Sequence, residues 1–206
     1  MHFYEPKDGH RLAYDPFKAI VAPRPIGWIS TIDAEGRPNL GPYSFFNALS
    51  SSPPIVAFSS EGMKDSPANA EATGEFVFNL STLPLARQMN ASSAMVARGV
   101  NEFELAGLTA APSRLVRAPR VAESPAALEC RLLEVLHLKD LDGRQTDRFV
   151  VFGQVVGVHI DERYLKDGYF DTAAAQPLAR CGYRDFAAVT EVFALLRPEE
   201  EATAAK

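Results

Sequence analysis

Two long β signals limit most strictly what this chain can fold into: residues 127–139, where apolar and polar residues alternate, and the apolar-rich stretch 147–160. In the first stretch, one face of an extended chain carries Leu128, Cys130, Leu132, Leu136 and Leu138. The opposite face carries Glu129, Arg131, His137 and Lys139. A period of two residues is that of a half-buried β-strand, and Asp142-Gly143 between the stretches favours a turn. They therefore predict one long antiparallel hairpin, kinked near Gly153 or Gly157.

Shorter β signals occupy the first 80 residues. Four apolar, partly β-branched runs predict strands at 26–32, 39–46, 55–59 and 75–80. Pro42 lies inside the second run and predicts an edge or a bulge, because proline cannot donate to a strand ladder. Together with the long hairpin, these runs predict a mainly β fold, a closed antiparallel barrel.

Two regions favour helices. In the first, Ser66 suits the N-cap, Pro67 the first helical position and Gly74 the C-terminal glycine. The second, residues 84–108, is amphipathic and helical with a break near its glycine at position 99. Three prolines in residues 109–126 then predict a long irregular connection.

Composition excludes several classes of protein. A length of 206 residues suits one domain, which we place at 1–196, followed by a flexible acidic and alanine-rich tail at 197–206. The net charge of −5 argues against non-specific nucleic-acid binding. No run reaches the roughly 18 apolar residues of a membrane span. Residues 1–8 lack a signal-peptide pattern, so we expect a cytoplasmic protein.

The cysteines and histidines show no metal-binding arrangement. Cys130 and Cys181 are far apart and lack CxxC spacing, and the four histidines are scattered. We expect two reduced structural thiols and no metal site.

Residues 59–66 carry the features of an anion site. Ser59, Ser60 and Ser66 supply hydroxyl donors around a turn that enters a helix, and Lys64 adds a full positive charge. The carboxylate of Asp65 would repel a phosphate unless it points away or caps the helix. The alternative is an ordinary capped surface helix with a solvated lysine, and the residues alone leave both interpretations open.

A second candidate is the segment Ser44, Phe45, Phe46 and Asn47. Asn47 can both donate and accept, as the edge of a heterocycle requires. Phe45 and Phe46 should point to opposite faces of a strand, so at most one of them lines a site. A plain barrel strand is the alternative.

Two further residues are ambiguous. Arg24 lies between two prolines, and the one that follows keeps it out of a helix. It is either a partner for an anion or carbonyl or a plain surface arginine. His159 ends the long strand, either approaching a cofactor or satisfied at the barrel rim. The chain has no GxGxxG after a strand and no phosphate-binding P-loop, so a nicotinamide cofactor would bind without a Rossmann fold.

These segments, in this order, resemble the flavin reductase-like family of FMN-binding split barrels, which includes flavoredoxin and the reductase components of two-component monooxygenases. The resemblance covers roughly residues 17–196. The matching segments are Arg24-Pro-Ile-Gly-Trp-Ile-Ser-Thr31, Asn39-Leu-Gly-Pro-Tyr-Ser-Phe-Phe-Asn47, Ser52-Pro-Pro-Ile-Val56, Lys64-Asp65, Gly74-Glu-Phe-Val-Phe-Asn-Leu80, Gly153-Gln-Val-Val-Gly-Val-His-Ile160 and Pro177-Leu-Ala-Arg-Cys-Gly-Tyr183.

The resemblance implies a homodimeric, six-stranded Greek-key split barrel with a few peripheral helices that holds FMN near the dimer interface. Carried over by position, the isoalloxazine ring would be edged by Thr31, Ser44, Phe45, Phe46 and Asn47. The ribityl phosphate would be held by Ser59, Ser60, Lys64 and Ser66. The implied set of cofactor-binding residues is completed by Arg24, Asp65, His159 and Arg180.

The implied activity is an NAD(P)H-dependent flavin reductase that passes hydride from NADH or NADPH to FMN, with a flavin-dependent monooxygenase as a candidate partner. One alternative is an FMN electron carrier without NAD(P)H turnover, and another is a barrel that binds haem or a different small ligand. No side chain is assigned as a general acid or base, because the flavin carries the hydride.

Overall fold

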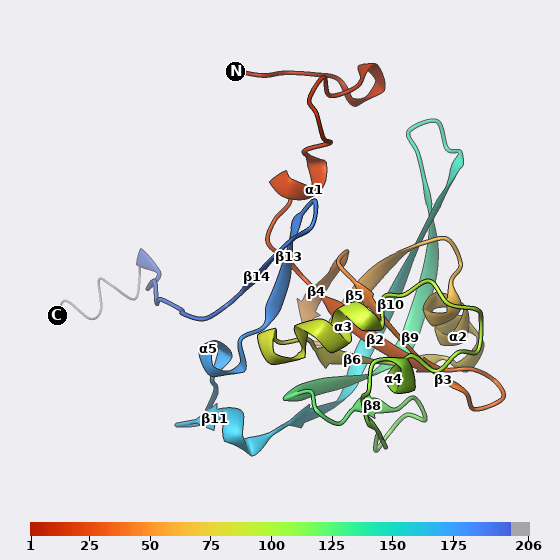
Figure 1. Ribbon diagram of the computed structural model, residues 1–206, viewed down its shortest axis with the longest axis vertical. Coiled ribbons are helices and arrows are strands. Elements are labelled where there is room, and N and C mark those ends of the chain that lie inside the picture. The colour runs from red at the N-terminus through yellow and green to blue at the C-terminus, as the bar shows by residue number, and fades with distance from the viewer. Residues whose placement is uncertain (199–206) are drawn as a thin grey trace.

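The computed structural model describes residues 1–198 and is mainly β, with few and short helices (Figure 1). Its main sheet has seven strands, all antiparallel to their neighbours, in the order β3-β2-β6-β9-β10-β5-β4. Their bounds are β2 Gly27–Ile32, β3 Pro38–Tyr43, β4 Phe46–Ser51, β5 Pro54–Glu61, β6 Glu75–Leu80, β9 Ala126–Lys139 and β10 Gln145–Ile160.

The predicted count of six strands is wrong for this sheet. Residues 39–46, expected to be one strand, instead supply the end of β3 and the start of β4. The chain leaves one edge of the sheet after Tyr43 and joins the opposite edge at Phe46, so only Ser44 and Phe45 connect the two edges. Pro42 lies in an edge strand, which confirms that prediction.

The smaller elements surround this sheet. A three-stranded sheet joins β1 (Arg24–Pro25), β13 (Leu178–Gly182) and β14 (Asp185–Ala188), and two-stranded sheets pair β7 (Ala110–Ala111) with β8 (Arg120–Val121) and β11 (Leu165–Lys166) with β12 (Tyr169–Phe170). The α-helices are α1 Phe17–Ile20, α2 Asp65–Thr73, α3 Ala86–Ala91, α4 Glu102–Leu105 and α5 Thr172–Ala175. The 3-10 turns are η1 Pro6–Asp8, η2 Leu83–Leu85 and η3 Glu162–Tyr164. Among the helices of residues 1–198, none has the length and apolar character needed to cross a membrane.

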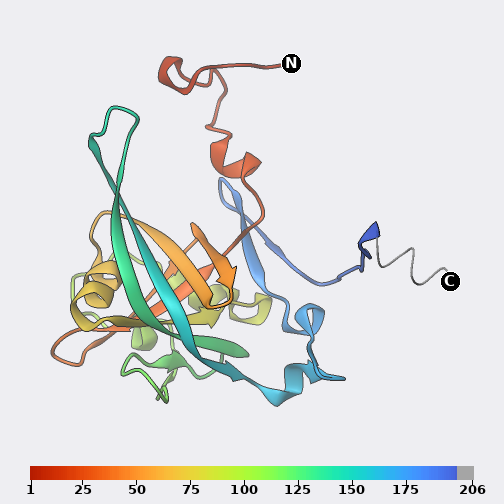
Figure 2. The ribbon, with the colours of Figure 1, turned by 180° about the vertical axis from the view of Figure 1, so that it is seen from behind.

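The long hairpin is confirmed as β9 and β10. Their ladder is interrupted between Phe152 and Gly153 and again between Val155 and Gly157, where the kinks were predicted. A Cβ added at Gly153 would lie 2.4 Å from the ring of Phe76, so this position leaves no room for a side chain. The turn end of the hairpin stands clear of the barrel (Figure 2).

The helix predictions are partly wrong. Helix α2 begins at Asp65 with Lys64 as its N-cap, two residues before the predicted start, because the hydroxyl of Ser66 is buried and accepts from Asn39 Nδ2 instead of capping. Gly74 ends the helix in the left-handed region (φ 72°), as predicted. Residues 84–108 form the two short helices α3 and α4 with a loop at 92–101 between them.

The apolar core has two main parts. Ile29, Phe58, Phe76 and Val151 are fully buried inside the barrel, where the ring centroids of the two phenylalanines lie 5.4 Å apart. Trp28, on the other face of β2, packs under α3 and α4. The N-terminal residues and the β13–β14 hairpin extend away from the barrel (Figures 1 and 2). The predicted tail at 197–206 lies almost wholly outside the described residues.

Candidate functional site

Two adjoining cavities lie along the β3–β4 connection. Cavity A, about 810 Å³, is lined by parts of β3, β5, the start of α2 and the 92–101 loop. Cavity B, about 460 Å³, is lined by β1 and the residues before it, by β4 and by β5. Ser44, Phe45 and Ser59 line both cavities. The two therefore form one elongated depression that crosses the break between the edge strands.

Cavity A carries the predicted anion-binding residues. Lys64, Asp65 and Ser66 line it at the start of α2, together with Ser59. The ammonium group of Lys64 is exposed and has no ion pair among residues 1–198. The carboxylate of Asp65, in contrast, lies 3.5 Å from Nε of Arg98. The charge that sequence reasoning identified as an obstacle to an anion is thus compensated.

A buried polar network supports this wall from behind. Asn39 donates through Nδ2 to Oγ of Ser66 at 2.9 Å and to Oγ1 of Thr31 at 3.1 Å, and Asn69 also donates to Thr31, at 3.2 Å. Burial raises the pKa of Tyr43 to about 12, against hydrogen bonds with Ser66 and Ser60 that lower it. The phenol is therefore neutral at pH 7. Thr31 lines neither cavity, and the network fixes the rotamer of Ser66.

Cavity B contains a buried cation with an unused donor. Arg24 is 7 % exposed, and its Nη1 donates to the backbone carbonyls of Lys18 and Val21. Its Nε is buried and has no hydrogen-bond partner within residues 1–198, and its guanidinium carbon lies 5.6 Å from the ring centroid of Phe45. Buried donors are nearly always paired, so this N–H suits an acceptor on a ligand in cavity B.

The phenylalanines and the asparagine after Ser44 form the rest of the wall. Phe46 stacks on Phe78 at 4.7 Å, whereas Phe45 is 42 % exposed. Both line cavity B, so the prediction that at most one does is wrong. The reason is that Phe45 precedes β4 and does not follow its alternation. Asn47 is exposed, and its Oδ1 accepts from the backbone of Ala48 at 2.9 Å.

Comparison with known proteins fits this arrangement. A family model described as "Flavin reductase like domain" matches residues 21–178. The chain belongs to the flavin reductase-like family. An uncharacterised protein of Deinococcus radiodurans is 37 % identical over 183 residues, which span 83 % of this chain and 78 % of that relative.

Solved structures agree with the family assignment. Nitrilotriacetate monooxygenase component B from Bacillus cereus matches with a TM-score of 0.86 and 27 % identity, covering 95 % of this chain and 98 % of that one. A protein with a split-barrel domain from Shewanella frigidimarina matches with a TM-score of 0.82 and 24 % identity. The match covers 96 % of this chain and 99 % of that one, which shows that the two share a fold. This flavin reductase-like chain therefore has a split-barrel fold.

The donor set suits an elongated ligand with an anionic end and an aromatic end. Cavity A offers a free ammonium group at Lys64 and the hydroxyls of Ser59 and Ser66. Cavity B offers the unpartnered N–H of Arg24 and the exposed ring of Phe45. A flavin mononucleotide has this chemistry, and the residues present in this flavin reductase-like protein fit it.

Besides Thr31, three residues of the predicted set lie outside cavities A and B. Ser60 is buried and donates to the carbonyl of Gly62 at 2.8 Å. His159 lines a third cavity of about 550 Å³, which shares no lining residue with cavities A or B. Arg180 lies opposite Arg24 in the β1–β13 register, but its guanidinium contacts the ring of Phe186 at 4.4 Å and the carbonyl of Tyr183.

Other charged residues at cavity A were missed from sequence. Lys18, Arg98, Glu102 and Arg148 all line it. Arg148 pairs with Glu61 across the β5–β10 ladder at 3.1 Å. The 92–101 loop has no periodicity that would place Arg98, and the glycine at position 99 was the sole hint that the helical pattern breaks there.

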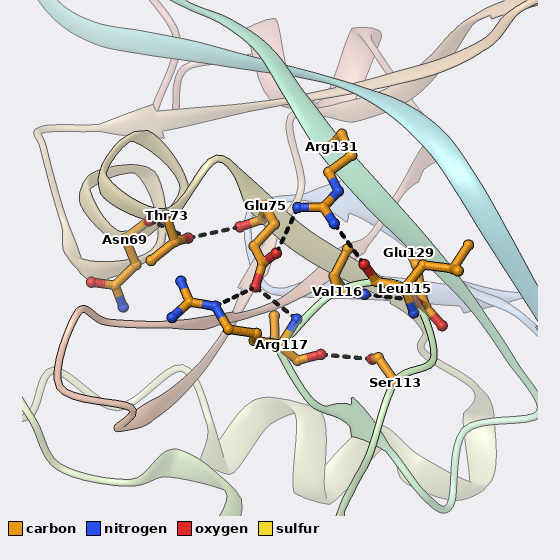
Figure 3. Close-up of polar contacts among 10 residues, drawn as sticks. Asn69, Thr73, Glu75, Ser113, Leu115, Val116, Arg117, Glu129 and Arg131 are labelled. Carbon is orange, nitrogen blue, oxygen red and sulfur yellow. Dashed lines mark hydrogen bonds and ion pairs between the residues drawn. The ribbon is translucent and has the colours of Figure 1, made fainter.

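A second polar cluster, away from cavities A and B, holds the loop at 113–118 against the barrel (Figure 3). The fully buried carboxylate of Glu129 accepts from three successive backbone N–H groups of residues 114–116, at 2.8, 2.6 and 3.0 Å. Glu75 accepts from the backbone N–H of Arg117 at 2.7 Å and from Nη1 of Arg131 at 3.0 Å. The two faces predicted for β9 hold around Cys130, where this loop covers Glu129, but the prediction is wrong beyond Leu132, because the register shifts there and Leu136 is 41 % exposed while Val135 packs on the core.

The electrostatics of Glu129 reflect that arrangement. Burial raises the pKa of this carboxyl, but the hydrogen bonds from the backbone of residues 114–116 and from His159 outweigh it and lower the pKa overall. Nε2 of His159 lies 2.5 Å from Oε1. Glu129 is therefore ionised at neutral pH, and its hydrogen bonds hold the loop at 113–118 against the barrel.

Proposed function

We propose that this chain is a cytoplasmic FMN-binding flavoprotein that acts as an NAD(P)H-dependent flavin reductase. The observation that carries the proposal is the pair of adjoining cavities, with the free ammonium of Lys64 at one end and the unpartnered N–H of Arg24 at the other. When bound, FMN would supply the redox chemistry by accepting hydride from NADH or NADPH and passing electrons on.

In this proposal cavity A holds the phosphate. Lys64 supplies a charge-assisted hydrogen bond, and the hydroxyls of Ser59 and Ser66 supply further donors. Ser60 and Thr31 act behind the wall, by fixing the turn at residue 62 and the position of Ser66.

Cavity B holds the ring. Its lining includes Ser44, Phe45, Phe46 and Asn47, and the guanidinium of Arg24 lies against the ring of Phe45. A reduced flavin ring carries negative charge, and a positioned guanidinium stabilises such charge in a site shielded from water. His159 and Arg180 lie outside both cavities and are left out of the proposed site.

We also propose that residues 1–196 act as one domain in a homodimer, with a flavin-dependent monooxygenase as the acceptor of reduced flavin. Apolar side chains beside cavity B and on the protruding segments are solvent-exposed in the single chain, including Phe17, Ile20, Phe45, Leu49 and Phe186. Exposed apolar side chains of this kind would be covered in an interface between subunits. The similarity to a monooxygenase component supports the choice of acceptor.

Two measurements test the function. When the purified protein is titrated with FMN, the flavin absorbance should change and reach saturation as FMN binds. Steady-state oxidation of NADH and NADPH, with and without excess FMN, should then show turnover that free FMN accelerates. Binding without turnover would instead establish the electron carrier, and no FMN binding would refute both.

A further inference from the structure

The 92–101 loop is fixed at both ends and forms one wall of cavity A. At its start, Ser92 accepts from Nε1 of Trp28 at 2.9 Å and donates to the carbonyl of Met89 at 2.8 Å. At its end, the side chain of Asn101 accepts from the backbone of Phe103 at 3.1 Å and caps α4. Between these anchors, Met95 is 99 % exposed and Arg98 reaches the start of α2.

The contact of Arg98 with Asp65, at 3.5 Å, is the one ion pair between this loop and α2 within residues 1–198. Asp65 is the first residue of the helix and directly follows Lys64. Both line cavity A, as does Arg98. A carboxylate at this point lies beside the cation that would bind an anion, and its field would oppose that binding.

Of the other charged residues that line cavity A, Lys18 is a cation without an ion pair among residues 1–198, and the remaining ones are paired or have a raised pKa. Arg148 is paired with Glu61 at 3.1 Å. Glu102 accepts from the backbone of Leu40 at 3.0 Å, and burial raises the pKa of its carboxyl. Asp65 is thus the carboxylate whose negative charge would weaken the attraction between Lys64 and a bound anion, and Arg98 is the cation that pairs with it.

We propose that Arg98 determines the preference of this site for a phosphorylated flavin, because it neutralises Asp65 and leaves the charge of Lys64 available to a dianionic phosphate. This inference rests on the proposed FMN binding. Arg98 acts through Asp65, so it is a positioning and charge-compensating residue. A flavin without a phosphate gains nothing from it.

The expected effect is moderate, because the pair is largely solvent-exposed on the arginine side. Exposed charge pairs contribute up to about 1 kcal/mol, which corresponds to roughly a fivefold change in a dissociation constant. The effect must also depend on salt, since charges in water are screened over about 10 Å at 0.1 M and about 3 Å at 1 M.

The experiment measures dissociation constants for FMN and for riboflavin, by flavin fluorescence, at low salt and at 1 M NaCl. The variants are Arg98→Ala, Asp65→Asn and the double variant. Arg87→Ala is the control, because it removes an equal charge from an exposed position on α3 that lines neither cavity.

We expect Arg98→Ala to weaken FMN binding about fivefold at low salt and far less at 1 M NaCl, with riboflavin binding unchanged. Adding Asp65→Asn should restore FMN binding, and Arg87→Ala should have no effect. Equal weakening of both flavins would show a packing role and overturn the inference, as would a double variant that stays weak. A wild-type protein that binds neither flavin would instead refute the proposed function itself.

Discussion

Replacing Glu129 by glutamine should destabilise the fold strongly. Each carboxylate oxygen accepts two hydrogen bonds: Oε1 from the backbone of Arg114 and from His159, and Oε2 from the backbone of residues 115 and 116. A glutamine amide has one acceptor oxygen, so either orientation loses two of the four bonds. Each hydrogen bond to a charged group contributes about 1.5–3 kcal/mol. Part of the loss is offset because a neutral amide costs less to bury than a carboxylate, so we expect the free energy of unfolding to fall by about 3 kcal/mol.

The assay is urea denaturation of wild type, Glu129→Gln and the control Glu134→Gln, which changes an exposed residue of the same strand.

The pH dependence of the stability difference has a definite sign. The folded-state pKa of Glu129 is lowered, so its contribution is complete above the unfolded-state pKa, about 4.3, and is lost as pH falls through the folded-state pKa. The gap between wild type and Glu129→Gln should hold from pH 8 to 5 and narrow below about pH 4. A variant as stable as wild type at pH 7 would refute the reasoning.

Three further predictions concern the cofactor site, the barrel and the thiols. Lys64→Ala should weaken FMN binding by about 1–3 kcal/mol, read from a binding titration, since it removes a charge-assisted bond to phosphate. Gly153→Ala should lower stability by about 1–3 kcal/mol in denaturant melts, because the added Cβ would meet the ring of Phe76 at 2.4 Å. Burial raises the pKa of Cys130 to about 12, so a thiol reagent at pH 8 should modify Cys181 and spare Cys130 until the protein unfolds.

Much of the barrel could be predicted from local pattern. The alternation around Leu128 and Cys130 sets the long hairpin, since a strand with one buried face repeats every two residues. Pro42 marks an edge for a covalent reason, the missing N–H. The hydroxyls and the lysine of residues 59–66 gather at cavity A because β5 and the start of α2 are neighbours in sequence.

The rest depended on contacts that sequence spacing does not record. The run at 39–46 is continuous in composition, but the sheet breaks inside it because β3 and β4 occupy opposite edges. Glu129 looks like a solvent-facing residue until the loop at 113–118 covers it with backbone donors. Arg98 reaches Asp65 from a position 33 residues later through a loop without periodicity.

The pairing of β1 with β13 sets a timetable for cofactor loading. Arg24, at the ring end of the proposed site, lies opposite Arg180, which is 156 positions later in the chain. At about 5–20 residues per second, a ribosome takes roughly 8–30 s to make that interval. Until then the strand that carries Arg24 lacks its β13 partner, so the ring end of the proposed site is completed only after β13 has been made. A flavin that needs Arg24 would therefore bind in full only after β13 has paired with β1.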